Sequence, residues 1–239
     1  MGLWGEGSDK AGGTRPARNP LALSTKAARY GAVAVLAGLA ILALPVGRGY
    51  LDGRAVAPDH AARADALIAE GRGGDALGEG RLDRLLEVQD PGFHEHRGID
   101  LATPGAGITT MTQSLAKRVG FEEFQPGWAK LRQSGLAMGY ETGMTKAQIA
   151  ALWLETVEMG PIEGQWRIGF FDAAEVLHDR PVAALTNAEF ADLTARLIAP
   201  GALGRDTEAR EERVARILRL WAGDCAPTGP RDVWLEGCA

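Results

Sequence analysis

Residues 89–100 of the chain read QDPGFHEHRGID, and residues 105–117 read GAGITTMTQSLAK. The second stretch is a glycine-rich approach to a threonine-rich helix start, with Lys117 about two turns further on. Backbone N–H groups and the hydroxyls of Thr110 and Thr112 at such a start favour an anionic or sugar-phosphate ligand. Threonine is also a common helix cap and glycine a common turn residue, so this pattern taken alone is a weak signal and is better explained as an ordinary helix start.

Taken together, the two stretches resemble the first two motifs of the family 51 glycosyltransferases. These peptidoglycan glycosyltransferases polymerise lipid II at the outer face of the bacterial inner membrane. The first family motif runs Glu-Asp-x-x-Phe-x-x-His-x-Gly, and the chain matches it at Asp90, Phe93, His96 and Gly98. The second runs approximately Gly-Gly-Ser-Thr-Ile-Thr-Gln-Gln-Leu-x-Lys, and the chain matches it at Gly107, Thr109, Thr110, Thr112, Gln113, Leu115 and Lys117. Further matches follow in order, so the resemblance covers residues 85–200, about half of the chain.

The resemblance implies a mostly α, lysozyme-like transglycosylase domain behind one N-terminal transmembrane helix. It implies lipid II or a glycan strand as the ligand, with the lysines around the lipid pyrophosphate. A divalent cation at that pyrophosphate is compatible with these motifs, which require no other cofactor. The substrate-binding residues that the resemblance implies are His96, Thr110, Thr112, Gln113, Lys117 and Lys130.

The chain departs from the family pattern where the resemblance implies catalysis. The first motif's Glu, the family's general base toward the 4-hydroxyl of the acceptor sugar, is Gln89 here. A second Glu, in a Lys-x-x-Glu motif that assists at the donor phosphates, is Gln133. An amide does not accept a proton near neutral pH, and general-base catalysis is typically worth ~10² to 10⁴ in rate. Only six residues separate Asp100 from Gly107, where the family carries a longer segment with basic residues.

Two hypotheses of different class follow from these departures. In the first, the chain binds lipid II or nascent glycan with weak or no catalysis, as a scaffold or regulator of wall synthesis. In the second, it is an active, divergent glycosyltransferase with Asp90 or Glu95 as its base. A lytic enzyme is disfavoured because no paired acid and nucleophile can be identified. His94 and His96 lack a convincingly spaced third ligand for a metal, and His96 is better explained as a structural hydrogen-bonding residue.

Length and composition describe a globular chain with one apolar segment. The 239 residues are 46% hydrophobic and 24% charged, and their mean hydropathy of −0.10 excludes a polytopic membrane protein. The net charge of −5 argues against a general nucleic-acid binder. Residues 1–29 carry five basic and two acidic side chains, so this tail has a charge of +3.

The uncharged residues 30–47 follow the basic tail directly and read YGAVAVLAGLAILALPVG. Eighteen helical residues span roughly 27 Å, just enough for the hydrocarbon core of a bilayer. The positive-inside rule then places residues 1–29 in the cytoplasm and the following domain in the periplasm, at the bacterial inner membrane. A signal peptide cleaved after Ala55-Val56-Ala57 and a buried core helix are the alternatives, and the segment is too apolar on all sides for the latter.

The rest of the chain reads as a stem and a helical domain. Glycines break up residues 48–80, which we interpret as a stem with a short helix over 61–70. Capping boxes begin helices at Thr145 and Thr186. We expect further helices over 81–88, 109–119, 128–141, 167–178 and 207–222, and no sheet. The predicted domain boundaries are 81–205 for the glycosyltransferase-like domain and 206–239 for a C-terminal helix and tail.

The two cysteines, Cys225 and Cys238, lie in that tail with twelve residues between them. In an oxidising periplasm the pair could close a disulfide worth on the order of 3 kcal/mol. Two unpaired thiols on a frayed end are the equally open alternative, because a sequence does not supply bridging geometry.

Overall fold

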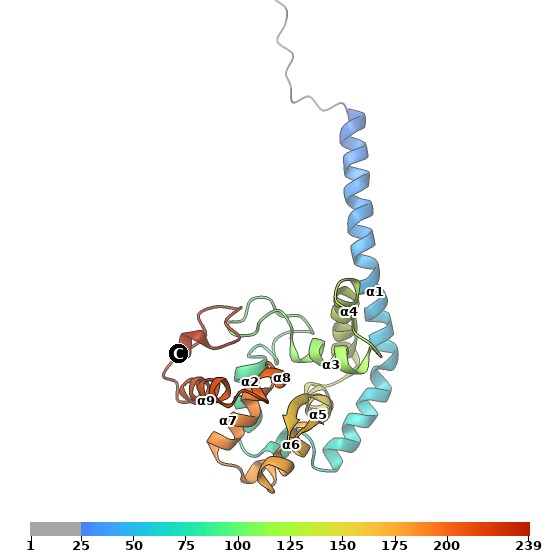
Figure 1. The fold of residues 1–239 in the computed structure, drawn as a ribbon. Coiled ribbons are helices and arrows are strands. Elements are labelled where there is room, and N and C mark those ends of the chain that lie inside the picture. The colour runs from blue at the N-terminus through green and yellow to red at the C-terminus, as the bar shows by residue number, and fades with distance from the viewer. Residues whose placement is uncertain (1–24) are drawn as a thin grey trace, which may run out of the picture. The chain divides into compact units, whose positions relative to one another are not determined.

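The computed structural model describes residues 25–239 (Figure 1). The described residues divide into two units, the first ending at Ala40 and the second covering Ile41–Ala239. The described part is mostly helical, as expected. Its elements are α1 (Thr25–Ala69), η1 (Gly74–Leu77), α2 (Arg81–Gln89), α3 (Met111–Val119), α4 (Trp128–Gly143), α5 (Lys146–Thr156), β1 (Glu158–Ile162), β2 (Gln165–Ile168), α6 (Phe170–His178), η2 (Val182–Ala184), α7 (Asn187–Arg196), α8 (Pro200–Leu203), α9 (Thr207–Trp221) and η3 (Glu236–Cys238).

The first part of α1 is the apolar segment near the N-terminus. An 18-residue window of this helix has a mean hydropathy of 2.1, and none of the window is buried. Length and composition therefore fit one helix able to cross a membrane. Most of the basic tail, residues 1–24, lies outside the described residues.

The second part of α1 differs from the expected stem. The helix continues without a break to Ala69, so the short helix expected over 61–70 is the end of a much longer one. A Cβ at Gly49 or Gly53 would collide with the backbone of α4, and the buried Ala57 also packs against α4 at Gly143. Small side chains on one face thus let α1 lie directly against α4, and the compact unit begins at Ile41 rather than near residue 81.

Helix α5 lies at the centre of the domain. Six consecutive residues, Ile149–Leu154, are buried, which requires packing on every side of the helix. It packs on α3 and α6 in one continuous hydrophobic core. A smaller second cluster joins α2, α7 and α9 to the C-terminal tail; its buried members are Val88, Ala191, Ala195, Ile217, Leu220, Leu235 and Cys238.

An antiparallel hairpin, β1 and β2, corrects the expectation of no sheet. Its two-residue turn is Glu163-Gly164, both with positive φ (51° and 76°). The alternation of apolar residues is hidden because β1 contains Gly160 and Pro161, and because the register shifts between Glu158 and Gly160. The helix expected from residue 167 consequently begins only at Phe170.

The other local predictions are confirmed to within about two residues. Both capping boxes form, with Thr145 and Thr186 accepting from the backbone N–H three residues on. Cys225 and Cys238 form a disulfide, which decides between the two open alternatives.

Candidate functional site

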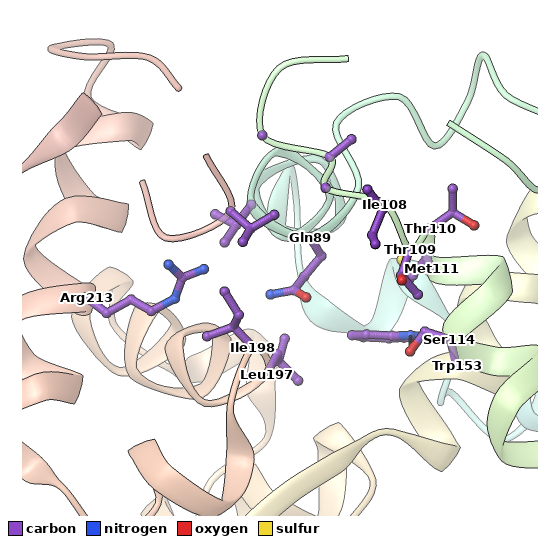
Figure 2. A pocket seen from close by; sticks show the side chains of 15 residues that line it. Gln89, Ile108, Thr109, Thr110, Met111, Ser114, Trp153, Leu197, Ile198 and Arg213 are labelled. Carbon is purple, nitrogen blue, oxygen red and sulfur yellow. Dashed lines mark hydrogen bonds between the residues drawn. The ribbon is translucent and has the colours of Figure 1, made fainter. Parts of the chain in front are cut away.

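A pocket of about 340 Å³ lies where the C-terminal end of α2 meets the start of α3 (Figure 2). Helices α5 and α9 and the end of α7 supply its other walls. Its lining residues are Val88, Gln89, Gly105, Ala106, Gly107, Ile108, Thr109, Thr110, Met111, Ser114, Trp153, Leu197, Ile198, Arg213 and Val233. None of these described lining residues is Asp or Glu.

Gln89 is the last residue of α2 and faces this pocket. The neighbouring residues of α2, Leu86 and Val88, are buried and fix the rotation of the helix. Within residues 25–239 the Gln89 side-chain amide makes no hydrogen bond, and Figure 2 shows it extending into the pocket. The structure therefore places an amide, and no carboxylate, at this position of the pocket wall.

Arg213 of α9 faces the same pocket and was not singled out from the sequence. Only 2% of its surface is exposed, yet its Nε and Nη1 atoms have no hydrogen-bond partner in the structure. Its guanidinium lies 5.5 Å from the centre of the Trp234 ring. Burial and the charge of Arg216 lower the pKa of Arg213 to about 10, against the opposite effect of Asp232. Arg213 is thus charged at neutral pH and unpaired, which is the state that a buried anion-binding residue requires.

The residue after Gln89 points the other way, into a buried polar network. Asp90 is fully buried, and its Oδ2 accepts hydrogen bonds from the backbone N–H of Met111 (2.7 Å) and from His96 Nε2 (2.9 Å). His96 Nδ1 accepts from the backbone N–H of Gly98 (3.0 Å), so the ring proton lies on Nε2. Asp90 and His96 therefore join the first motif to α3. These hydrogen bonds hold the His96 ring in the network.

The predicted binding residues of the second motif are part of the same network. Thr110 caps α3 and donates from Oγ1 to the carbonyl of Gly98 (2.8 Å). Thr112 Oγ1 donates to Glu141 Oε1 (2.5 Å), and Gln113 Nε2 donates to Ser134 Oγ (2.8 Å). All three side chains are buried. We call these residues, with Asp90 and His96, the motif scaffold, because their polar groups already bond to protein.

Gln133 on α4 is buried against this scaffold. Its Nε2 donates to the backbone carbonyl of Gln113 at 2.6 Å, and its Oε1 has no hydrogen-bond partner among the described residues. An atom that contacts a carbonyl oxygen must be a donor, so the position suits an amide and disfavours an ionised carboxylate. Gln133 does not line the pocket with Gln89.

Neither predicted phosphate-binding lysine lines this pocket: Lys130 contacts one of its residues, and Lys117 lines a separate cavity of about 620 Å³. Lys130 Nζ donates to Thr109 Oγ1, a pocket residue, at 2.9 Å. Burial lowers the pKa of Lys130, and the charge of Lys117 acts in the same direction. Lys117 itself lies with its Nζ 5.4 Å from the centre of the Phe124 ring. The two lysines are thus close enough for the charge of Lys117 to act on Lys130.

The remaining predictions concern a replacement base and a cation. Glu95 is exposed, and neither Glu95 nor Asp90 lines the pocket. Within residues 25–239 no group of three or more His, Cys, Asp or Glu side chains is arranged to hold a metal ion. Because the pocket lining also lacks carboxylates, the residues do not fit a protein-held divalent cation.

Comparison with known proteins matches this part of the chain to one family. The transglycosylase family model matches residues 77–221. The penicillin-binding protein 1B of Vibrio cholerae is 26% identical over 161 residues, which are 61% of this chain and 21% of that protein. The biosynthetic peptidoglycan transglycosylase of Shigella boydii is 29% identical over 129 residues, 48% of this chain and 52% of that protein. The chain thus matches about a fifth of the first relative and half of the second. The family match spans well over half of the chain and contains the pocket's Gln89 and Arg213, so the chain belongs to the transglycosylase family, the family 51 glycosyltransferases.

Proposed function

We propose that this protein is a membrane-anchored transglycosylase homologue of cell-wall synthesis that binds lipid II or nascent glycan and catalyses little or no polymerisation. One observation carries the proposal. The pocket presents a buried, unpaired guanidinium and an amide, and no described lining residue is a carboxylate. A cationic site without a base is suited to holding an anionic glycan donor more than to activating an acceptor.

The binding part of the proposal rests on Arg213. A buried charge without a partner is costly, so its presence at a pocket favours a site for an anion. Its Nε and Nη1 atoms have no protein partner within residues 25–239, so the guanidinium keeps donors for a phosphate or carboxylate. Lipid II carries a pyrophosphate beside its sugars, so it offers both the anion and the polar groups that the pocket can contact.

The catalytic part rests on Gln89. Glycan transfer in this family requires that the acceptor 4-hydroxyl lose its proton as its oxygen attacks the donor sugar and the pyrophosphate leaves. The Gln89 amide cannot take that proton. Asp90 is fully buried and already accepts two hydrogen bonds, and Glu95 does not line the pocket. These contacts weaken the alternative in which either carboxylate is the base of an active, divergent glycosyltransferase.

The proposed location is the bacterial inner membrane, with the basic tail cytoplasmic and the domain periplasmic. The apolar helix supports one anchor. Cleavage after Ala57 would remove the part of α1 that packs on α4 at Gly49 and Gly53, which disfavours a signal peptide. Alkaline phosphatase fused after residue 80 should therefore be active and membrane-bound. Release of a shortened soluble protein would contradict this. The membrane and other cell-wall synthesis proteins are the partners that this location implies.

The experiment that tests binding measures the affinity of the purified protein for lipid II in detergent micelles. Wild type should bind, Arg213→Met should bind at least tenfold more weakly, and Arg231→Met, an exposed arginine of the C-terminal tail, is the matched control. Equal affinity of wild type and Arg213→Met would refute the site. Absence of binding by wild type would refute the function.

A further inference from the structure

The segment Ala222–Ala239, which we call the C-terminal loop, lies beyond the part of the chain that matches the family model. The Cys225–Cys238 disulfide closes it. Leu235 and Cys238 are buried against α2, α7 and α9 in the second hydrophobic cluster. This segment is therefore a folded attachment of the chain's own rather than part of the matched domain.

The C-terminal loop forms backbone hydrogen bonds with the glycine-rich wall of the pocket, residues 105–108. The N–H of Gly105 donates to the carbonyl of Gly229 (3.0 Å), and the N–H of Gly107 donates to the carbonyl of Pro230 (2.7 Å). These two bonds lie on either side of Ala106 and hold a segment made of successive turns. They join a short, glycine-rich segment to a part of the chain more than 120 residues away in sequence.

Side chains of the C-terminal loop pack on the same wall. A Cβ at Gly105 would collide with the Pro227 ring, and one at Gly107 would collide with Val233. Both glycines also have positive φ (81° and 71°), which disfavours other residues at these positions. Val233 itself lines the pocket, and Trp234 lies under the Arg213 guanidinium.

Hydrogen bonds inside the C-terminal loop make it rigid. The Asp232 carboxylate accepts from the backbone N–H groups of Thr228, Glu236 and Gly237. These bonds lower the pKa of Asp232 despite the opposing effect of partial burial. Arg219 of α9 donates to the carbonyls of Cys238 and Ala239, which fixes the end of the chain on that helix.

We propose that the disulfide-closed C-terminal loop is a positioning element that sets the shape of the pocket. It holds residues 105–108 and the Arg213 guanidinium in the arrangement that the ligand meets. The consequence for ligand affinity rests on the function proposed above, whereas the consequence for residues 105–108 stands independently of it. With the disulfide open, the loop loses the closure that keeps Gly229, Pro230 and Val233 against the wall.

Reduction of the folded, full-length protein with dithiothreitol tests the proposal. Dithiothreitol is oxidised to its cyclic disulfide, and the protein disulfide takes up two electrons and two protons to become two thiols. Amide hydrogen exchange at Gly105 and Gly107 should then accelerate by about tenfold or more, while exchange in α5 stays unchanged. Reoxidation should restore the slow exchange, and Cys225→Ser/Cys238→Ser should behave like the reduced protein.

The second readout is lipid II affinity, which should weaken by about tenfold on reduction and recover on reoxidation. Val233→Ala should weaken it in the oxidised protein too, whereas Glu236→Gln, an exposed change in the same loop, should not. Unchanged exchange at Gly105 and Gly107 after complete reduction would overturn the positioning role, as would exchange that accelerates equally in α5. If oxidised protein binds no lipid II, the proposed function fails, and hydrogen exchange still decides the positioning role.

Discussion

The motif scaffold and the pocket lie next to each other and differ in whether their polar side chains are hydrogen-bonded to protein. In the scaffold, Asp90, His96 and Thr110 are buried and hydrogen-bonded to protein. In the pocket, the amide of Gln89 and two nitrogens of Arg213 have no hydrogen-bond partner in the part of the chain that the structure describes. Partnered polar groups stabilise the fold, and unpartnered ones in a pocket are free for a ligand. Residues taken from one family motif, adjacent in sequence at 89 and 90, thus have different roles.

The largest effect on stability is expected when the scaffold loses the carboxylate of Asp90. Asp90→Ala removes the acceptor for Met111 and His96 in a fully buried place and should cost about 3–5 kcal/mol of unfolding free energy. Asp90→Asn should cost less, about 1–3 kcal/mol, because its amide nitrogen would face the His96 Nε2 proton. Denaturant unfolding measures both. A loss of unfolding free energy below about 0.5 kcal/mol for Asp90→Ala would contradict the structural role assigned to Asp90.

Gln133→Glu tests whether the scaffold suits an amide at a position where the family has Glu. The new carboxyl would be buried against the Gln113 carbonyl, which raises its pKa because only the protonated form can donate there. Its folded pKa then exceeds its unfolded pKa, so stability is retained below about pH 4 and lost as pH rises. We expect a cost of roughly 2–3 kcal/mol at pH 7.

The matched control for that change is Gln165→Glu. Gln165 is exposed in β2, and its side chain makes no hydrogen bond within residues 25–239, so a carboxylate there stays in water. Its stability should change by less than about 0.5 kcal/mol at pH 7. Equal stability of Gln133→Glu and this control across pH 4–8 would contradict the assignment of the Gln133 hydrogen bond.

A substitution in the pocket should raise the unfolding free energy rather than lower it. Arg213→Met replaces an unpaired buried charge with an apolar chain and should stabilise the protein without ligand by about 1–2 kcal/mol at pH 7. The folded pKa of Arg213, about 10, lies below its ordinary value of 12.5, so wild type recovers stability as pH rises through about 10. The difference between the two proteins should therefore shrink over that range. Destabilisation by Arg213→Met would show that the guanidinium is structural.

Gln89→Ala should have the smallest effect on stability. The amide makes no hydrogen bond within the described residues, so its removal should change the unfolding free energy by no more than about 0.5 kcal/mol. Thermal unfolding of Gln89→Ala and Asp90→Ala under the same conditions compares the two losses of stability. Losses of similar size would contradict the assignment of Gln89 to the pocket and Asp90 to the scaffold.

The sequence was sufficient for the helical fold, the apolar anchor segment and the position of Gln89. Local signals sufficed there: capping boxes, a continuous apolar run and a motif whose spacing persists. It did not reveal Arg213, because the surrounding segment AREERVARILR looks like a solvated helix face and only packing shows which arginine is buried. Nor did it separate binding residues from scaffold residues, since Thr112 and Gln113 face protein through contacts with distant α4.

The long α1 and the hairpin show the same limit. Glycines at 49 and 53 weaken a helix in isolation, but here they allow α1 to pack closely on α4, so tertiary contact overrides local propensity. In β1, Gly160 and Pro161 conceal the strand, and only its pairing with β2 defines it. The disulfide likewise depends on the fold of the C-terminal loop around Asp232, which brings the two cysteines together.

Polymerisation of lipid II by wild type and by Gln89→Glu, measured side by side, tests the central claim most directly. The claim is that this pocket binds the glycan substrate but lacks the base. We predict little or no glycan strand from wild type, and a gain of at least about tenfold from Gln89→Glu, because the position already faces the pocket. Gln125→Glu, an exposed change elsewhere, should gain nothing. Robust polymerisation by wild type that Gln89→Glu does not increase would contradict the account.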